Sequence, residues 1–189
     1  MLVLAGLTTV TVLAEGALLD WSALLITDAG LVGVAQSGIG YMLFAIAMTI
    51  GRLTGDTVIT RIGDRSTLLW GGCMAVAGFV LLLTSSIAAV ALTGFILIGL
   101  GAANIVPVLY RRAGSQTVIP PGVAIAAITI TGYAGIRLGP VSIGFVAKAM
   151  GLNVAFWLLA ALLCLVPLLS GIVAPHRNAS ARVQFTQGE

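Results

Sequence analysis

The sequence predicts an all-α membrane protein with six transmembrane helices. Of its 189 residues, 59% are hydrophobic and only 8% are charged, against about 25% charged residues in an ordinary soluble domain. So few charges would leave large apolar patches on a water-exposed surface. The composition therefore indicates a protein that spans the lipid bilayer, and it argues against a secreted disulfide scaffold, a disordered chain and a nucleic-acid-binding protein.

The individual helices follow from the gaps between charged residues, because a helix needs about 20 apolar residues to cross the hydrocarbon core. The first segment is apolar apart from Glu15 and Asp20, and the uncharged gap at 66–110 is long enough for two helices with a turn at 84–86. The predicted helices span residues 2–25, 31–58, 66–84, 87–110, 121–149 and 152–174. Together they form one bundle over 1–174, followed by a polar cytoplasmic tail at 175–189.

The cations predict how the bundle is oriented in the membrane. With both termini in the cytoplasm, the outside loops hold only Lys148, at a helix end. The inside loops then hold Arg61, Arg65, Arg111, Arg112, Arg177 and Arg182. Cytoplasmic loops carry an excess of Lys and Arg. We therefore expect a multi-pass protein of the cytoplasmic (inner) membrane with both termini inside. A signal peptide is the rival interpretation of the N-terminus, but no cation precedes the apolar stretch and an acid interrupts it.

A glycine-centred charged loop follows the second predicted helix. Residues 51–65 read GRLTGDTVITRIGDR, and this stretch resembles the cytoplasmic loop signature of the major facilitator superfamily. Arg61, Gly63 and Arg65 match its Arg-x-Gly-x-Arg core. Thr60 stands where the signature usually has an acid, so the motif is degraded.

Three further stretches are similar to the C-terminal half of the MosC-like branch, whose relatives are of the fucose-permease type. They read EGALLDWS at 15–22, GLGAANIVP at 99–107 and GYAGIRLGP at 132–140. The resemblance implies half of a twelve-helix bundle, built as a 3+3 inverted repeat, with a midplane site between the halves. It implies secondary transport of a small polar solute, sugar-like, organic acid or drug-like, by alternating access and driven by protons.

The same resemblance implies a partner, because no six-helix half precedes Met1 in this sequence. We expect a fragment or truncated reading frame whose partner is an N-terminal six-helix half. A half-transporter that pairs with a second copy is the alternative. A different class of function, a membrane scaffold or an inactive fragment without transport activity, also stays open.

The charged loop supplies one group of candidate residues. Arg52 and Asp56 are four residues apart, so on a helix their side chains would meet. Gly63 would let the chain turn between two cations. The gating candidates are Arg52, Asp56, Arg61, Gly63 and Arg65. The alternative is a solvated loop that only sets the topology.

Polar residues within the predicted helices supply a second group. A cation in a membrane helix costs roughly 3 kcal/mol or more, so Arg137 should face a wet cavity or a carboxylate. At 1.5 Å per residue, Glu15 and Arg137 lie at similar depths from the cytoplasmic side. We expect either a structural or gating ion pair between them, or a direct role in substrate binding or proton coupling.

Further substrate-binding candidates are polar residues on the other helices. Asn104 precedes Pro107, which frees a backbone carbonyl nearby, and it either contacts substrate or packs between helices. Tyr133 lies one turn from Arg137 and could donate to a ligand, and Gln36 and Tyr41 are weaker candidates. We expect no enzyme activity, cofactor, metal or nucleic acid. Cys73 and Cys164 should be buried, and the only histidine is in the tail.

Overall fold

The computed structural model describes residues 1–117 and 119–174. Over this part of the chain, the elements are α1 (Leu2–Asp28), the short 3₁₀ turn η1 (Val34–Gln36), α2 (Ile39–Leu53), α3 (Gly55–Thr84), α4 (Ala88–Ala102), α5 (Ile105–Gly114), α6 (Pro121–Met150), α7 (Leu152–Leu163) and α8 (Leu165–Val173). Six segments are long and apolar enough to cross a membrane. The predicted all-helical membrane fold is confirmed. The predicted tail at 175–189 lies outside the described residues.

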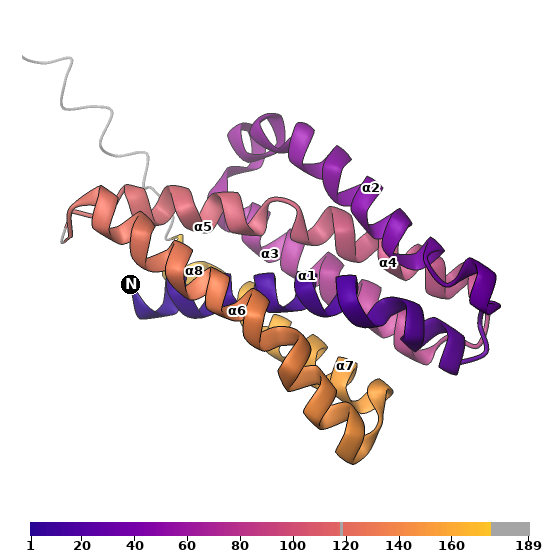
Figure 1. Cartoon of the computed structure of the whole chain (residues 1–189). Coiled ribbons are helices and arrows are strands. Elements are labelled where there is room, and N and C mark those ends of the chain that lie inside the picture. The colour runs from indigo at the N-terminus through magenta and orange to yellow at the C-terminus, as the bar shows by residue number, and fades with distance from the viewer. Residues whose placement is uncertain (118, 175–189) are drawn as a thin grey trace, which may run out of the picture.

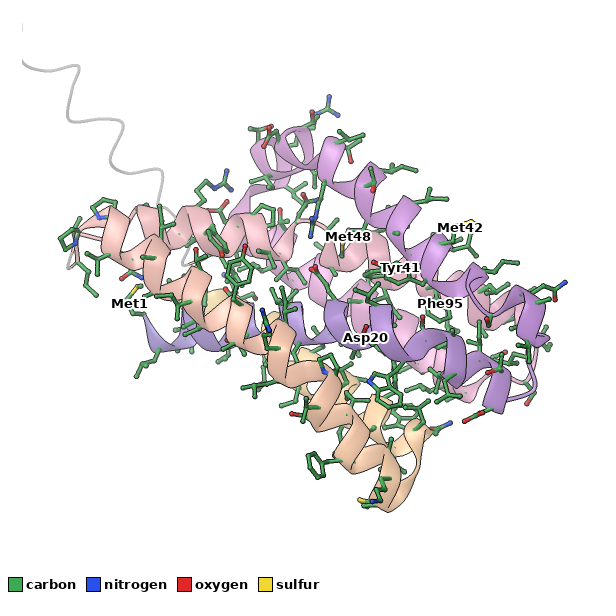
Figure 2. All side chains as sticks on the ribbon, in the orientation of Figure 1. Met1, Asp20, Tyr41, Met42, Met48 and Phe95 are labelled. Carbon is green, nitrogen blue, oxygen red and sulfur yellow. The ribbon has the colours of Figure 1, made fainter. Side chains whose placement is uncertain are left out.

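The spans pack as one bundle around α1. Figure 1 shows α1 running through the middle, with α6 crossing it on one side and α2 lying over α4 on the other. The fourth span is α4 followed by α5, and the sixth is α7 followed by α8. Figure 2 shows Tyr41 and Met48 of α2 on the side facing α4, near Phe95. Phe95 lies against Gly40, where an added Cβ would come within 2.7 Å of its ring.

The chain reverses between the second and third spans at Gly63, as its glycine suggested. Gly63 has φ 81° inside the residue range of α3, a backbone conformation that glycine adopts without steric cost. The sequence predicted helices at 31–58 and 66–84, with a loop between them. Instead α2 ends at Leu53, and the first turns of α3, from Gly55, continue toward the reversal as helix. The charged loop is therefore mostly helical.

Small residues let the helices approach closely. At Gly78 of α3, an added Cβ would lie 2.6 Å from the carbonyl oxygen of Gly94 on α4. At Gly135 of α6, it would lie 2.8 Å from the carbonyl oxygen of Thr9 on α1. In lipid, association of helices depends on such close packing rather than on a hydrophobic driving force. The glycines thus fix which helices are neighbours.

Large apolar side chains cover much of the outer surface. Leu53, Phe145 and Leu168 are each more than 70% exposed, as a bilayer-facing surface requires. Cys73 is exposed and Cys164 is only partly buried, so the prediction that both are buried was wrong. Apolar composition does not separate a lipid-facing position from a core position in a membrane helix.

Candidate functional site

The central charged group is an ion pair between α1 and α2. Arg52 Nη2 lies 3.3 Å from Glu15 Oε2, and the two side chains are 49% and 23% exposed. The helices run in opposite directions, and each residue lies thirteen positions from the end on the Asp28 and Ile39 side. At 1.5 Å per residue, both charges are about 20 Å from that end. Glu15 therefore lies midway along α1, and Arg52 reaches it from the last turn of α2.

The predicted pair between Glu15 and Arg137 was wrong. Helix α6 packs on α1 through Gly132, Gly135 and Gly139, and at 100° per residue Arg137 lies about 140° to 160° around α6 from each of them. The Arg137 side chain is exposed and makes no ion pair with another residue of the described ranges. The two depths are similar, but Arg137 lies on the side of α6 that faces away from α1.

A polar side of α1 lies inside the bundle. Thr8, Thr11 and Ser22 are fully buried, and the two threonine hydroxyls donate to carbonyls one turn earlier, at 2.9 and 2.8 Å. Glu15 shares this side. Its Oε1 is buried and has no hydrogen-bond partner among the described residues. One carboxylate oxygen is therefore held by Arg52, and the other can take a proton or the donor group of a ligand.

The other predicted binding residues do not gather around this pair. Tyr133 is 66% exposed and lies on the same side of α6 as Arg137, one turn away. Gln36 is exposed in the η1 turn. Tyr41 packs on Phe44 of its own helix, with ring centroids 5.7 Å apart. These side chains do not form one pocket in this arrangement.

Asn104 lies in the break between α4 and α5, and its side chain contacts the break between α2 and α3. Its Nδ2 donates to the carbonyl oxygen of Gly51 at 3.0 Å, in a buried position, and its Oδ1 lies where a Cβ on Gly55 would be. This geometry favours the packing alternative for Asn104 over the substrate contact. The break at Asn104 has a local cause, because Pro107 has no N–H for the carbonyl four residues earlier.

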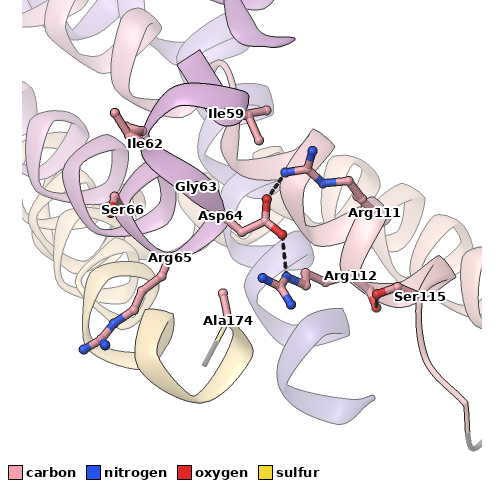
Figure 3. A pocket seen from close by; sticks show the side chains of 10 residues that line it. All are labelled: Ile59, Ile62, Gly63, Asp64, Arg65, Ser66, Arg111, Arg112, Ser115 and Ala174. Carbon is pink, nitrogen blue, oxygen red and sulfur yellow. Dashed lines mark hydrogen bonds and ion pairs between the residues drawn. The ribbon is translucent and has the colours of Figure 1, made fainter. Parts of the chain in front are cut away.

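A second charged group lies at the end of the bundle that the cation pattern predicts to be cytoplasmic. Asp64, next to the Gly63 turn, forms ion pairs with Arg111 and with Arg112 of α5, the latter at 2.6 Å. Figure 3 shows both guanidinium groups directed at the one carboxylate. The Asp64 side chain is 13% exposed. The group lines an open cavity of about 680 Å³ that Arg65 and Ala174 also border. It ties the start of the third span to the end of the fourth.

The residues of the predicted charged loop lie in different places. Arg52 is paired with Glu15, and because α2 ends at Leu53, it does not share a helix with Asp56 as predicted. Asp56 and Arg61 are exposed on the first turns of α3. Arg65 extends toward α8, where its guanidinium nitrogens lie 3.6 and 3.8 Å from a Cβ built on Gly171.

Asp64, Arg111 and Arg112 were not predicted as partners. The sequence could have predicted this contact. The predicted topology places residues 61–65 and 111–112 on the same side of the membrane, and only one acid lies next to Gly63. An acid among four cations on one membrane side is expected to be shared by some of them.

The chain resembles known membrane transporters along most of its length. It is 46% identical over 154 residues to an MFS-type transporter of Yersinia pestis, which covers 82% of this chain and 40% of that protein. It is 33% identical over 178 residues to the membrane protein MosC of Rhizobium meliloti, which covers 94% of this chain and 44% of MosC. The chain therefore spans about two fifths of the length of these curated relatives. No family model matches it.

The fold has a solved counterpart. The POT family transporter PepTSo superposes with a TM-score of 0.71 over 90% of this chain and 36% of that one, at 20% identity. At this identity the likeness concerns the fold alone. Six helices long and apolar enough to span a membrane, the loop signature, a relative named as an MFS-type transporter and the relative MosC agree with one another. The chain belongs to the major facilitator superfamily of transporters.

Proposed function

We propose that this chain is the C-terminal six-helix half of a secondary transporter, which moves a small polar solute across the cytoplasmic membrane by alternating access. The observation that carries the proposal is the ion pair that Glu15, at the middle of a membrane span, forms with Arg52. Ionisable residues within membrane spans are expensive, and they mark substrate, ion or proton pathways. The solute is sugar-like, an organic acid or drug-like. The N-terminal half, or a second copy of the chain, completes the pathway.

The surroundings of Glu15 support proton coupling. One oxygen is bound by Arg52 and the other is buried without a partner. Protonation of the carboxylate would weaken the attraction to Arg52, so the pair has two states that a proton can select. A solute that contacts either charge would select between the same states. Proton movement and solute movement would then both depend on the state of the Glu15–Arg52 pair.

The charged group at Asp64 supplies the gate of this proposal. It joins the Gly63 turn to α5 with two ion pairs. Such a group holds the cytoplasmic ends of the third and fourth spans together when intact, and it releases them when broken. Gly63 and Arg65 of the loop signature line the same cavity as this group, and Arg61 is exposed two residues before Gly63.

The proposed orientation can be tested by cysteine labelling. In a chain with Cys73 and Cys164 replaced by serine, a cysteine at Ser86 should react with an impermeant maleimide in intact cells, because it lies in an outside loop. A cysteine at Ser115 should react only after the membrane is opened. The reverse pattern would overturn the topology.

Transport itself can be tested in a chimera. The chain would replace the matching segment of the Yersinia pestis relative, and the chimera would be expressed in weakly buffered cells exposed to labelled sugars, carboxylic acids and cationic drugs. We expect uptake of one class to be accompanied by alkalinisation of the medium for symport, because protons enter with the solute. For antiport, we expect efflux of one class to be accompanied by alkalinisation of the medium, because protons enter as the solute leaves. Solute movement without a pH change would contradict the coupling. Absence of movement for every class, with normal membrane insertion, would favour the scaffold alternative.

A further inference from the structure

Two membrane spans break at the point where they cross. The second span breaks at Thr54, between α2 and α3, and the fourth breaks at Asn104, between α4 and α5. The Gly51 carbonyl accepts the Asn104 side-chain amide at 3.0 Å and the Thr54 hydroxyl at 3.3 Å. In a continuous helix it would accept the N–H of residue 55. One side chain thus takes part in both breaks.

The crossing is tightly packed as well as hydrogen-bonded. A Cβ on Gly51 would lie 2.6 Å from Ala103 Cβ. The Asn104 side chain fills the space that a side chain on Gly55 would need. Neither helix can therefore rotate or bend at its break without displacing the other at this position.

The Glu15–Arg52 pair and the Asp64 group lie on opposite sides of this crossing along the chain. Arg52, the partner of Glu15, directly follows Gly51. The short helical segment that begins at Gly55 leads to Asp64, and α5, which begins after Asn104, ends with Arg111 and Arg112. Each of the two segments thus runs from the crossing to one side of the Asp64 group.

We propose that Asn104 is a positioning residue that couples the Glu15–Arg52 pair to the Asp64 group, so that a change at the intramembrane pair moves the two cytoplasmic segments as one unit. The inference rests on the proposed gate but not on the identity of any solute. Two sites are coupled when the state of one changes the equilibrium of the other, with effects that are typically 5-fold or more.

The test measures how Glu15 affects access to the cytoplasmic cavity. The reporter is a single cysteine at Ser66, which lines that cavity, in the full chain with Cys73 and Cys164 replaced by serine. Its rate of labelling by an impermeant maleimide is measured in inside-out vesicles. Asp64→Asn breaks the gate directly and should raise the rate about 5-fold or more.

Glu15→Gln should also raise the labelling rate about 5-fold, because it releases Arg52. In an Asn104→Ala background, the same Glu15→Gln change should alter the rate less than 2-fold, while Asp64→Asn keeps its full effect. Asn153→Ala, at an exposed position on α7, is the matched control and should leave the Glu15 effect unchanged. Asn104→Gln keeps an amide donor and should restore part of the coupling.

A merely structural role for Asn104 predicts a different pattern. It would change the starting rate in every background but leave the factor produced by Glu15→Gln the same, since independent effects add as free energies. An unchanged factor in Asn104→Ala overturns the proposal. So does the absence of any Glu15→Gln effect when Asp64→Asn opens the cavity. If Asp64→Asn itself changes nothing, the gate fails and the coupling fails with it.

Discussion

Replacing Gly78 by leucine is expected to prevent the six-helix unit from assembling. An added Cβ at this position would lie 2.6 Å from the Gly94 carbonyl oxygen, 2.7 Å from Ile98 Cγ1 and 2.8 Å from the Ile98 backbone nitrogen. Two of these atoms belong to the backbone of α4, which cannot move aside by changing a rotamer. Overpacking a core typically costs about 1–3 kcal/mol, and separating α3 from α4 would cost more. We expect membrane-inserted, monodisperse protein to fall at least 10-fold.

The matched control is Gly6→Leu. Gly6 also lies inside a membrane-spanning helix, α1, but nothing is within 4 Å of a Cβ built there. The same substitution should therefore leave the yield within 2-fold of the original chain, as measured by size-exclusion chromatography in detergent. Equal losses at both positions would show that leucine is poorly tolerated for reasons unrelated to the contact between α3 and α4.

The number of spans could be predicted because it depends on charge spacing alone. Gaps such as 66–110 contain no charge, and the hydrocarbon core tolerates few, so each gap corresponds to one or two helices. The boundary between α2 and α3 could not be predicted in the same way. Its position depends on the Asn104 side chain at the Gly51 carbonyl, a contact between residues 53 positions apart.

The partner of Glu15 shows a similar limit. The sequence indicated that Arg137 needs a wet cavity or a carboxylate, and Glu15 lies at a similar depth. Arg52 belonged to the charged loop signature, where Asp56 was its expected neighbour, so only Arg137 was considered as the partner of Glu15. Depth along a helix does not fix direction around it, however. The glycines that pack α6 on α1 direct Arg137 away from Glu15.

The Asp64 group was missed for a different reason. The resemblance to the loop signature drew attention to Arg61, Gly63 and Arg65, whereas the acid that forms the ion pairs directly follows the glycine. Its partners lie in the last turn of α5. Only the arrangement of the third and fourth spans brings them together.

Glu15→Gln and Arg52→Gln are each expected to be severe, while the double change is milder than their sum. Removing one member of a fully buried pair typically costs 3–5 kcal/mol; because Arg52 is half exposed, we expect about 2 kcal/mol, a fall of roughly 4–8 °C in the thermal midpoint. The double mutant leaves no charge unpaired, so the cycle should show a coupling of at least 0.5 kcal/mol. Arg137→Gln, on the far side of α6, should change the thermal midpoint little. Its small effect should be independent of Glu15→Gln, so that the two effects are additive.

Transport measurements on the same variants distinguish a purely structural ion pair from one that couples proton movement to solute movement. A glutamine at position 15 cannot titrate, so in the reconstituted chimera Glu15→Gln should abolish accumulation driven by a pH gradient while solute exchange across the membrane continues. A purely structural pair predicts instead that both activities fall together, in proportion to the folded protein. Full gradient-driven accumulation in both Glu15→Gln and Arg52→Gln would remove the pair from the transport mechanism. Loss of accumulation in Arg137→Gln alone, at unchanged stability, would move the coupling site to the exposed side of α6, where Tyr133 is the neighbouring polar residue.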